Sequence, residues 1–160
     1  MEYAGIGSRR LSLTELTACS AVGEVLAELG WTLRTGACTG ADQAFAAGAL
    51  RVGGQVTLCL PWASYEAPWV GQAQKLGAQV LVLGPEHKAA RESVRLHPAA
   101  DRLSSGARAL HARNFLIIEG SSLVYAWPKP NQWGLGGTGQ GLLIAERLGI
   151  EVVRMDKVGL

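Results

Sequence analysis

The stretch Trp31-Thr32-Leu33-Arg34-Thr35-Gly36-Ala37-Cys38-Thr39-Gly40-Ala41-Asp42 decides how this chain folds. Residues 31–34 are predicted to form a strand, residues 35–42 form a glycine-containing loop, and the Ala-rich residues 42–52 are predicted to form a helix. A strand that passes through a short loop directly into a helix is the repeating unit of a parallel sheet covered by helices.

The same order of strand and helix repeats on both sides of this stretch. Strands are expected at residues 3–6, 31–34, 55–60, 79–83, 123–127 and 151–154, and helices at 13–29, 42–52, 65–76, 88–96, 107–118 and 139–148. Ser12 followed by Glu15 predicts a capping box at the start of the first helix, and Gly30 predicts its end. The pattern predicts an α/β protein: a single Rossmann-like domain over residues 1–160, with a mostly parallel sheet and helices on both faces.

The composition excludes several classes of protein. Of 160 residues, 48% are hydrophobic and 18% are charged, which excludes general disorder. The net charge is +2, and the longest basic run is Arg9-Arg10, so the clear basic stripe of a dedicated duplex-DNA binder is missing. Without an apolar stretch of about eighteen residues, we expect no membrane partner and a cytoplasmic protein. The three cysteines lie about twenty residues apart, so neither a disulfide framework nor a metal site is expected, and no cofactor is predicted.

Glycine-rich loops follow three of the expected strands. They are Gly5-Ile6-Gly7-Ser8-Arg9, residues 35–42, and Gly134-Leu135-Gly136-Gly137-Thr138-Gly139-Gln140-Gly141. Carboxyl ends of parallel strands meet at one edge of the sheet, where open α/β sheets bind ligands. The free N–H groups of a helix N-terminus attract anions, and glycine lets a phosphate approach the backbone. Each loop alone is equally typical of a tight turn, but three at one edge favour phosphate binding. None is a Walker A loop, and Arg10 replaces the third glycine of GxGxxG.

Two further features leave alternatives open. Asp42 is placed either to cap the following helix or to accept hydrogen bonds from a ribose. Tryptophans 62, 69, 127 and 133 lie near strand ends, where they either stack on a base or fill the edges of the core and an interface.

These residues resemble a known superfamily. Tyr3-Ala4-Gly5-Ile6-Gly7-Ser8-Arg9 and the stretch from Gly30 to Asp42 resemble the first half of the Rossmann-like domain of DNA-processing protein A. Arg113-Asn114, followed by a strand and by Gly136-Gly137-Thr138-Gly139, is similar to its second half. This is the SLOG superfamily, which includes the Lonely Guy phosphoribohydrolases. The resemblance spans residues 3 to about 153 and implies a nucleotide or nucleic-acid ligand at the strand ends and frequent dimerisation.

Three functions follow from the resemblance. We expect binding of a phosphorylated nucleotide or nucleotide-derived molecule by a homodimer or higher homo-oligomer. The residues expected at the ligand are Gly7, Ser8, Arg9, Thr35, Gly36, Thr39, Gly40, Asp42, Arg113, Asn114, Gly136, Gly137, Thr138 and Gly139.

The first alternative is a Lonely Guy-like N-glycosidase, which cleaves a nucleoside 5′-monophosphate with an Arg before the late strand and a Glu after a GGxGT turn. Arg113 is the candidate catalytic residue, but Gln140 replaces the Thr, and Leu142 and Leu143 stand where the Glu is expected. A carboxylate would then have to come from Asp42, Glu66 or Glu119, because Glu146 lies about one helical turn too far along.

The second alternative is a single-stranded DNA-binding recombination mediator. It requires basic residues to converge on one groove. The candidates are Arg9, Arg10, Arg34, Arg51, Arg108 and Arg113.

Overall fold

A six-stranded parallel sheet organises the chain. The structure, a computed structural model, describes residues 1–130 and 136–158. Its strands are β1 (Glu2–Gly7), β2 (Thr32–Thr35), β3 (Val56–Leu60), β4 (Gln79–Val82), β5 (Leu123–Trp127) and β6 (Glu151–Arg154). They lie in the order β4-β3-β2-β1-β5-β6, and every neighbouring pair is parallel. The strand order therefore reverses between β1 and β5, which is a Rossmann-like topology and confirms the predicted fold class.

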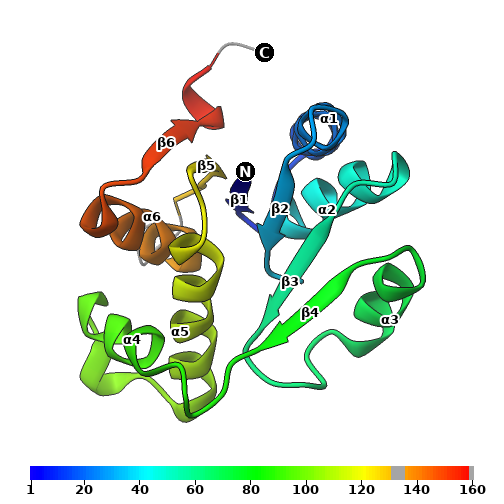
Figure 1. The fold of residues 1–160 in the computed structure, drawn as a ribbon. Coiled ribbons are helices and arrows are strands. Elements are labelled where there is room, and N and C mark those ends of the chain that lie inside the picture. The colour runs from blue at the N-terminus through cyan, green and yellow to red at the C-terminus, as the bar shows by residue number, and fades with distance from the viewer. Residues whose placement is uncertain (131–135, 159–160) are drawn as a thin grey trace.

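Helices cover both faces of the sheet (Figure 1). They are α1 (Leu13–Glu28), α2 (Ala41–Arg51), α3 (Ala67–Lys75), α4 (Lys88–Glu92), α5 (Ser105–Glu119) and α6 (Gly136–Leu148). The first three lie on one face and the last three on the other, so two hydrophobic clusters form. Side chains of β1 alternate between them: Tyr3 is buried on the α1–α2 side, and Ala4 and Ile6 are buried on the α5–α6 side. Within the described ranges, no helix is both long and apolar enough to cross a membrane.

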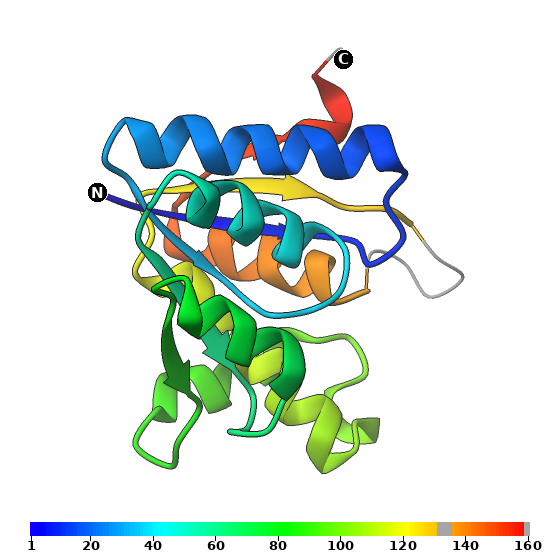
Figure 2. The same ribbon diagram turned by 90° about the vertical axis from the view of Figure 1, so that its right-hand side faces the viewer.

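Glycines allow α1, α2 and the sheet to approach closely. A Cβ atom on Gly48 of α2 would lie 1.9 Å from the carbonyl oxygen of Ser20 in α1, and one on Gly23 would lie 2.2 Å from the carbonyl oxygen of Phe45. A Cβ atom on Gly5 of β1 would lie 2.7 Å from the Phe45 ring. The two helices α1 and α2 are thus packed backbone against backbone and lie side by side (Figure 2).

Several predicted details are corrected. The capping box of Ser12 and Glu15 is present. The helical spacing of apolar residues in the sequence places Leu16, Cys19, Val22, Val25, Leu26 and Leu29 on one face, yet Val25 and Leu29 are 53% and 69% exposed. The reason is that α1 contacts α2 along a narrow stripe of small residues rather than along a wide apolar face. The helix expected at residues 88–96 is α-helical only to Glu92 and continues as a 3₁₀ turn, Ser93–Leu96. A second 3₁₀ turn, Ala100–Arg102, follows.

The last helix begins earlier than predicted. We expected it at residue 139, whereas α6 begins at Gly136, which has a φ of +59°. Its glycine-rich start is therefore the first turn of the helix rather than a loop. Trp133, Gly134 and Leu135, which the sequence places before it, lie outside the described residues.

We expect Gly48→Ala to destabilise the protein by about 1–3 kcal/mol, because the new methyl group meets a backbone oxygen that cannot move alone. Gly71→Ala in α3 is the matched control, since its Cβ would have no described atom within 4 Å. The control should gain up to about 1 kcal/mol from helix propensity. Urea unfolding followed by circular dichroism measures both, and equal effects of the two substitutions would contradict the close packing.

Candidate functional site

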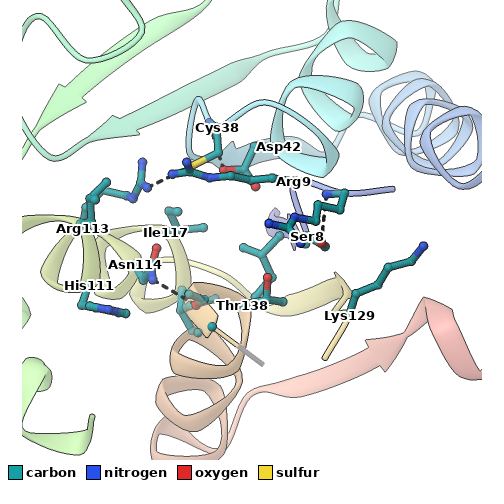
Figure 3. Close-up of a pocket in the computed structure, with 18 of the residues that line it drawn as sticks. Ser8, Arg9, Cys38, Asp42, His111, Arg113, Asn114, Ile117, Lys129 and Thr138 are labelled. Carbon is teal, nitrogen blue, oxygen red and sulfur yellow. Dashed lines mark hydrogen bonds between the residues drawn. The ribbon is translucent and has the colours of Figure 1, made fainter. Parts of the chain in front are cut away.

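A cavity of about 710 Å³ opens where the strand order reverses (Figure 3). Its walls come from the carboxyl end of β1, the loop between β2 and α2, the helix α5, the residues after β5, and the first turns of α6. Its lining residues are Ile6, Gly7, Ser8, Arg9, Arg10, Cys38, Asp42, Leu110, His111, Arg113, Asn114, Ile117, Ile118, Lys129, Pro130, Gly136, Gly137, Thr138 and Gly141. This is the position at which open α/β sheets bind ligands.

Arg113 is the most buried charge of the cavity wall. It projects from α5 and is 3% exposed. Its Nη1 donates a hydrogen bond of 3.0 Å to the carbonyl oxygen of Cys59 in β3, and its Nη2 lies 3.5 Å from the sulfur of Cys38. The guanidinium also lies 5.3 Å from the centre of the Tyr65 ring. Burial by itself lowers the pKa of Arg113, but the neighbouring Cys38, Asp42 and Tyr65 outweigh burial and raise it.

Asp42 is a buried carboxyl group beside this guanidinium. It lies in the first turn of α2, while Gly40 is the N-cap, so Asp42 does not fill the capping position. Its Oδ2 accepts a hydrogen bond of 3.4 Å from the backbone N–H of Cys38. Burial raises the pKa of Asp42 to about 6, although Arg113 and Arg9 act in the opposite direction. A Cβ atom on Gly36 would lie 2.5 Å from Asp42 and 2.7 Å from Arg113, which explains the glycine.

Arg9 reaches the same group of side chains from the end of β1. Its Nη2 donates to the hydroxyl of Tyr65 at 3.3 Å and lies 3.5 Å from the Cys38 sulfur. The neighbouring Ser8 is fixed at its backbone, since its N–H donates to the carbonyl oxygen of Trp127 in β5 at 2.9 Å. Two guanidinium groups, from β1 and from α5, therefore meet at the β2–α2 loop.

The N-terminus of α6 forms another part of the wall. The N–H groups in the first turn of a helix have no partner within the helix. The Asn114 side chain of α5 donates to the carbonyl oxygen of Gly137 at 3.2 Å and so fixes this turn. A Cβ atom on Gly137 would have its nearest neighbour at 3.9 Å, so the position faces open space. Figure 3 shows Thr138 across the cavity from Cys38 and Asp42.

Two histidines meet beside the cavity. The rings of His97 and His111 have their centroids 4.4 Å apart. Burial, together with His97 and Arg113, lowers the pKa of His111 to about 4, so its imidazole is neutral at pH 7. Its Nδ1 is buried and has no hydrogen-bond partner in the described part of the chain.

The structure brings together most of the predicted ligand residues. Those that line the cavity are Gly7, Ser8, Arg9, Asp42, Arg113, Asn114, Gly136, Gly137 and Thr138. The other predicted ligand residues contact neighbouring segments of the chain or do not line the cavity. Thr35 is buried and its hydroxyl donates to Gly5, Gly40 packs against the backbone of Ser8 and Arg9, and Thr39 is exposed. Gly36 lies beneath Asp42 and Arg113, and Gly139 does not line the cavity.

The sequence prediction missed several lining or supporting residues. Lys129 lies two residues after the end of β5, so the strand-end rule that identified the glycine loops would also have identified it. Its Nζ lies 2.6 Å from the carboxylate of Glu15. Arg10, which was expected only for the DNA-binding alternative, also lines the cavity. Tyr65 comes from the connection between β3 and α3, and its contact with Cys38 joins residues 27 positions apart. No local pattern marks such a contact.

The structure shows where the carboxylates and arginines that the two alternative functions require lie relative to the cavity. Asp42 is the one carboxylate among the described residues that line the cavity; Glu66, Glu119 and Glu146 do not line it. Arg9, Arg10 and Arg113 converge on the cavity, whereas Arg34, Arg51 and Arg108 bond elsewhere. The Arg34 guanidinium donates to Leu116, that of Arg51 pairs with Glu24, and that of Arg108 donates to Ala100.

The described tryptophans do not line the cavity. Trp127 is 4% exposed and lies in the core, Trp69 packs against the core, and Trp62 contacts the Tyr65 ring edge to face. Trp133 lies outside the described residues.

Two proteins of solved structure are similar to this chain. The X-ray structure of TM1055, a structural genomics target, matches with a TM-score of 0.64 and 19% identity, over 99% of this chain and 76% of that one. The X-ray structure of DNA processing protein A (DprA) from Streptococcus pneumoniae matches with a TM-score of 0.67 and 18% identity, over 94% of this chain. The chain has a SLOG-like fold.

The likeness to these neighbours concerns the fold. The match covers 48% of the DprA chain, so this chain spans about half its length. Comparison of the sequence with protein-family models and with curated proteins finds no match. Function must therefore be argued from the cavity, because one fold supports many activities.

We expect Asp42→Asn to stabilise the protein more at pH 7 than at pH 4. The pKa of Asp42 is about 6 in the folded protein against 3.8 for an unperturbed carboxyl. A group with a raised folded pKa contributes stability that is present below about pH 4 and lost as the pH rises through 6. Asn has no such dependence, so the free-energy difference between variant and wild type should grow by on the order of 3 kcal/mol. Urea unfolding from pH 4 to 7 measures it.

The stability of Asp42→Asn must be compared with that of the wild type at each pH, because His111 also contributes to the pH dependence. Its lowered pKa contributes stability above about pH 6.5 that is lost as the pH falls through 4, which opposes the effect of Asp42 in the same range. This contribution is common to wild type and Asp42→Asn and cancels in the difference. Parallel stability curves for the two proteins would show that burial of Asp42 does not control its ionisation.

Proposed function

We propose that the cavity binds a phosphorylated nucleotide-type ligand. One observation carries the proposal. Where the strand order reverses, the glycine-rich N-terminus of α6 lines the same cavity as Arg9, Arg10 and Lys129. Free N–H groups and arginine side chains are the usual protein partners of phosphate. The volume of about 710 Å³ lies within the range of small-molecule sites.

The phosphate fits best at the first turn of α6. Gly136 and Gly137 add no side chain between the backbone N–H groups and the cavity, and Asn114 holds the turn in place. The partial positive charge of a thirteen-residue helix acts at the same point. A phosphate there would lose water but gain several N–H donors.

The remaining walls suit a nucleoside. Asp42 and the Asn114 side chain offer hydrogen-bond acceptors for sugar hydroxyls, and Ile6, Leu110 and Ile117 offer an apolar surface for a flat ring. This mixture of a few polar groups on an apolar wall is typical of small-molecule sites.

The neighbour named DNA processing protein A supports a role with nucleotides or DNA in general terms. A free nucleotide fits the charges better than a long single strand. Strand binding without sequence preference needs a groove of several phosphate contacts, and three of the six candidate arginines are engaged away from the cavity. The homodimer stays a prediction.

One observation favours hydrolysis of an N-glycosidic bond as the second candidate. Asp42 places a carboxylate in the cavity from α2, opposite the α6 turn. It would stabilise the positive charge that develops on the sugar. If this candidate is right, Asp42→Asn should still bind a nucleoside monophosphate but release its free base at least a hundredfold more slowly, as chromatography of the products would measure. No base release by the wild type would leave a binding protein.

We expect Gly137→Asp to weaken nucleotide binding at least tenfold without unfolding the protein. The carboxylate would stand among the N–H groups proposed for phosphate, and the repulsion should cost at least tenfold in affinity, about 1.4 kcal/mol. An acidic residue in the first turn itself stabilises the helix by about 0.3–1 kcal/mol, so the variant should keep its melting temperature. The measurement is calorimetric titration with AMP, ADP, ATP, ADP-ribose, cyclic dinucleotides and oligo-dT, after a thermal-shift screen.

Two control variants test whether the loss of affinity comes from the charge of the new side chain, from its size, or from its position. Gly137→Asn has nearly the same size without the charge and should retain most of the affinity. Gly106→Asp puts the same charge into the first turn of α5, where the Cβ would have no described atom within 4 Å, and should bind like wild type. A ligand at 100 times its Kd should add roughly 2.7 kcal/mol of stability to the wild type. The absence of any shift, or equal binding by Gly137→Asp, would contradict the proposed site.

A further inference from the structure

The sulfur of Cys38 lies where three polar side chains from three different segments converge. Arg9, after β1, and Arg113, in α5, each place an Nη2 atom 3.5 Å from it. The Tyr65 hydroxyl lies 2.9 Å from it. Asp42 is the fourth polar neighbour and bonds to the Cys38 N–H rather than to the sulfur. Cys38 lines the cavity and is half-buried, so small molecules can reach it.

The hydrogen-bond directions indicate that the sulfur accepts. Arg9 Nη2 donates to the oxygen of Tyr65, so the Tyr65 proton is free to point at Cys38. Burial and the neighbouring Cys38 raise the pKa of Tyr65 to about 12, so this proton is retained. Arginine has no acceptor atom and must also donate. The sulfur of Cys38 is therefore an acceptor for both guanidinium groups, and the Tyr65 hydroxyl can donate to it as well.

The charge balance around the sulfur points the same way. Arg113 is 3% exposed, its Nε has no acceptor in the described residues, and no carboxylate of those residues lies within 4.0 Å of its guanidinium. A buried cation without a close counter-charge is costly. Arg9 and Arg113 face a single carboxylate, that of Asp42, so one positive charge remains in excess. This excess positive charge lies beside the Cys38 sulfur.

The other two cysteines have the opposite surroundings. Cys19 and Cys59 are fully buried, and burial raises the pKa of their thiols to about 12 and about 11. Cys38 instead lies two residues before the N-cap of the eleven-residue helix α2, where the helix dipole favours an anion. Reactive cysteines occupy such electropositive, partly exposed places, whereas buried structural cysteines are inert.

We propose that Cys38 is the nucleophilic cysteine of this protein and the site at which soft electrophiles modify it. With an alkyl halide, the sulfur forms a bond to carbon, the carbon–halogen bond breaks, and halide leaves with the electron pair. With hydrogen peroxide as oxidant, the sulfur bonds to one oxygen, the O–O bond breaks, and hydroxide leaves while Cys38 becomes a sulfenic acid. This proposal goes beyond nucleotide binding and does not rest on it, since either reaction proceeds without a ligand.

Iodoacetamide is the probe that tests it. The full chain, free of reductant and ligand at pH 7, is treated with excess reagent, and intact mass is followed over time. We expect one adduct, located on Cys38 by peptide mass spectrometry, with Cys19 and Cys59 reacting only after unfolding in urea. Cys38 should react roughly tenfold faster in the native protein than in the urea-unfolded chain at the same pH.

Arg9→Gln and Arg51→Gln form a matched pair of variants. Both remove one positive charge, but Arg51 lies at the other end of α2 and pairs with Glu24 at 3.0 Å. Arg9→Gln should slow the labelling of Cys38 by roughly tenfold, and Arg51→Gln should leave the rate unchanged. Native Cys38 reacting no faster than in the unfolded chain, or equal rates for the two variants, would overturn the proposal. The native-to-unfolded ratio decides the matter even if a variant folds poorly.

Discussion

The buried guanidinium of Arg113 is the interaction on which the geometry of the cavity depends. A charge in a protein interior must be surrounded by hydrogen-bond acceptors and by opposite charge, or it destabilises the fold. Arg113 finds them on separate segments: a carbonyl oxygen of β3, the sulfur of Cys38, the face of the Tyr65 ring and the nearby carboxyl of Asp42. The loops after β2 and β3 are thereby held to α5. The same packing explains the glycine at position 36, because a side chain there would displace both Asp42 and Arg113.

Burial also determines the charge of the cavity, because it shifts the pKa values of the titratable side chains that line it. Two arginines act to lower the pKa of Asp42, yet the loss of water outweighs them and raises it. The same loss of water keeps His111 neutral. The walls therefore carry fixed cations, a neutral imidazole and one carboxyl that titrates close to neutral pH. An anion entering this cavity meets an excess of positive charge that grows as the pH falls through the pKa of Asp42, because that carboxyl then loses its negative charge.

The fold and the position of the cavity could be predicted because they depend on local signals. Short strands, capping residues and glycine loops are each encoded within a few neighbouring residues, and parallel topology then brings the strand ends together. The contacts inside the site depend on tertiary packing instead. Nothing near Tyr65 indicates that it meets Cys38, and nothing near Arg34 indicates that its guanidinium turns to α5 while Arg9 turns to the cavity. The early start of α6 was not predicted either. Glycine is unfavourable in a helix interior, but it is tolerated in a first turn that faces open space.

The same reasoning limits which residues of α6 can take part in chemistry. Gly137, Thr138 and Gly141 line the cavity, which is the spacing of one helix face. Leu142 packs into the core and Leu143 is 40% exposed, so the two positions at which the sequence resemblance suggests a carboxylate do not line the cavity. A side chain at residue 141 would face it, but a Cβ there would lie 2.8 Å from Ile6, so the packing of β1 against α6 favours glycine. If a nucleotide binds in this cavity, a carboxylate that acts on it must therefore come from the opposite wall, where Asp42 lies beside the guanidinium groups.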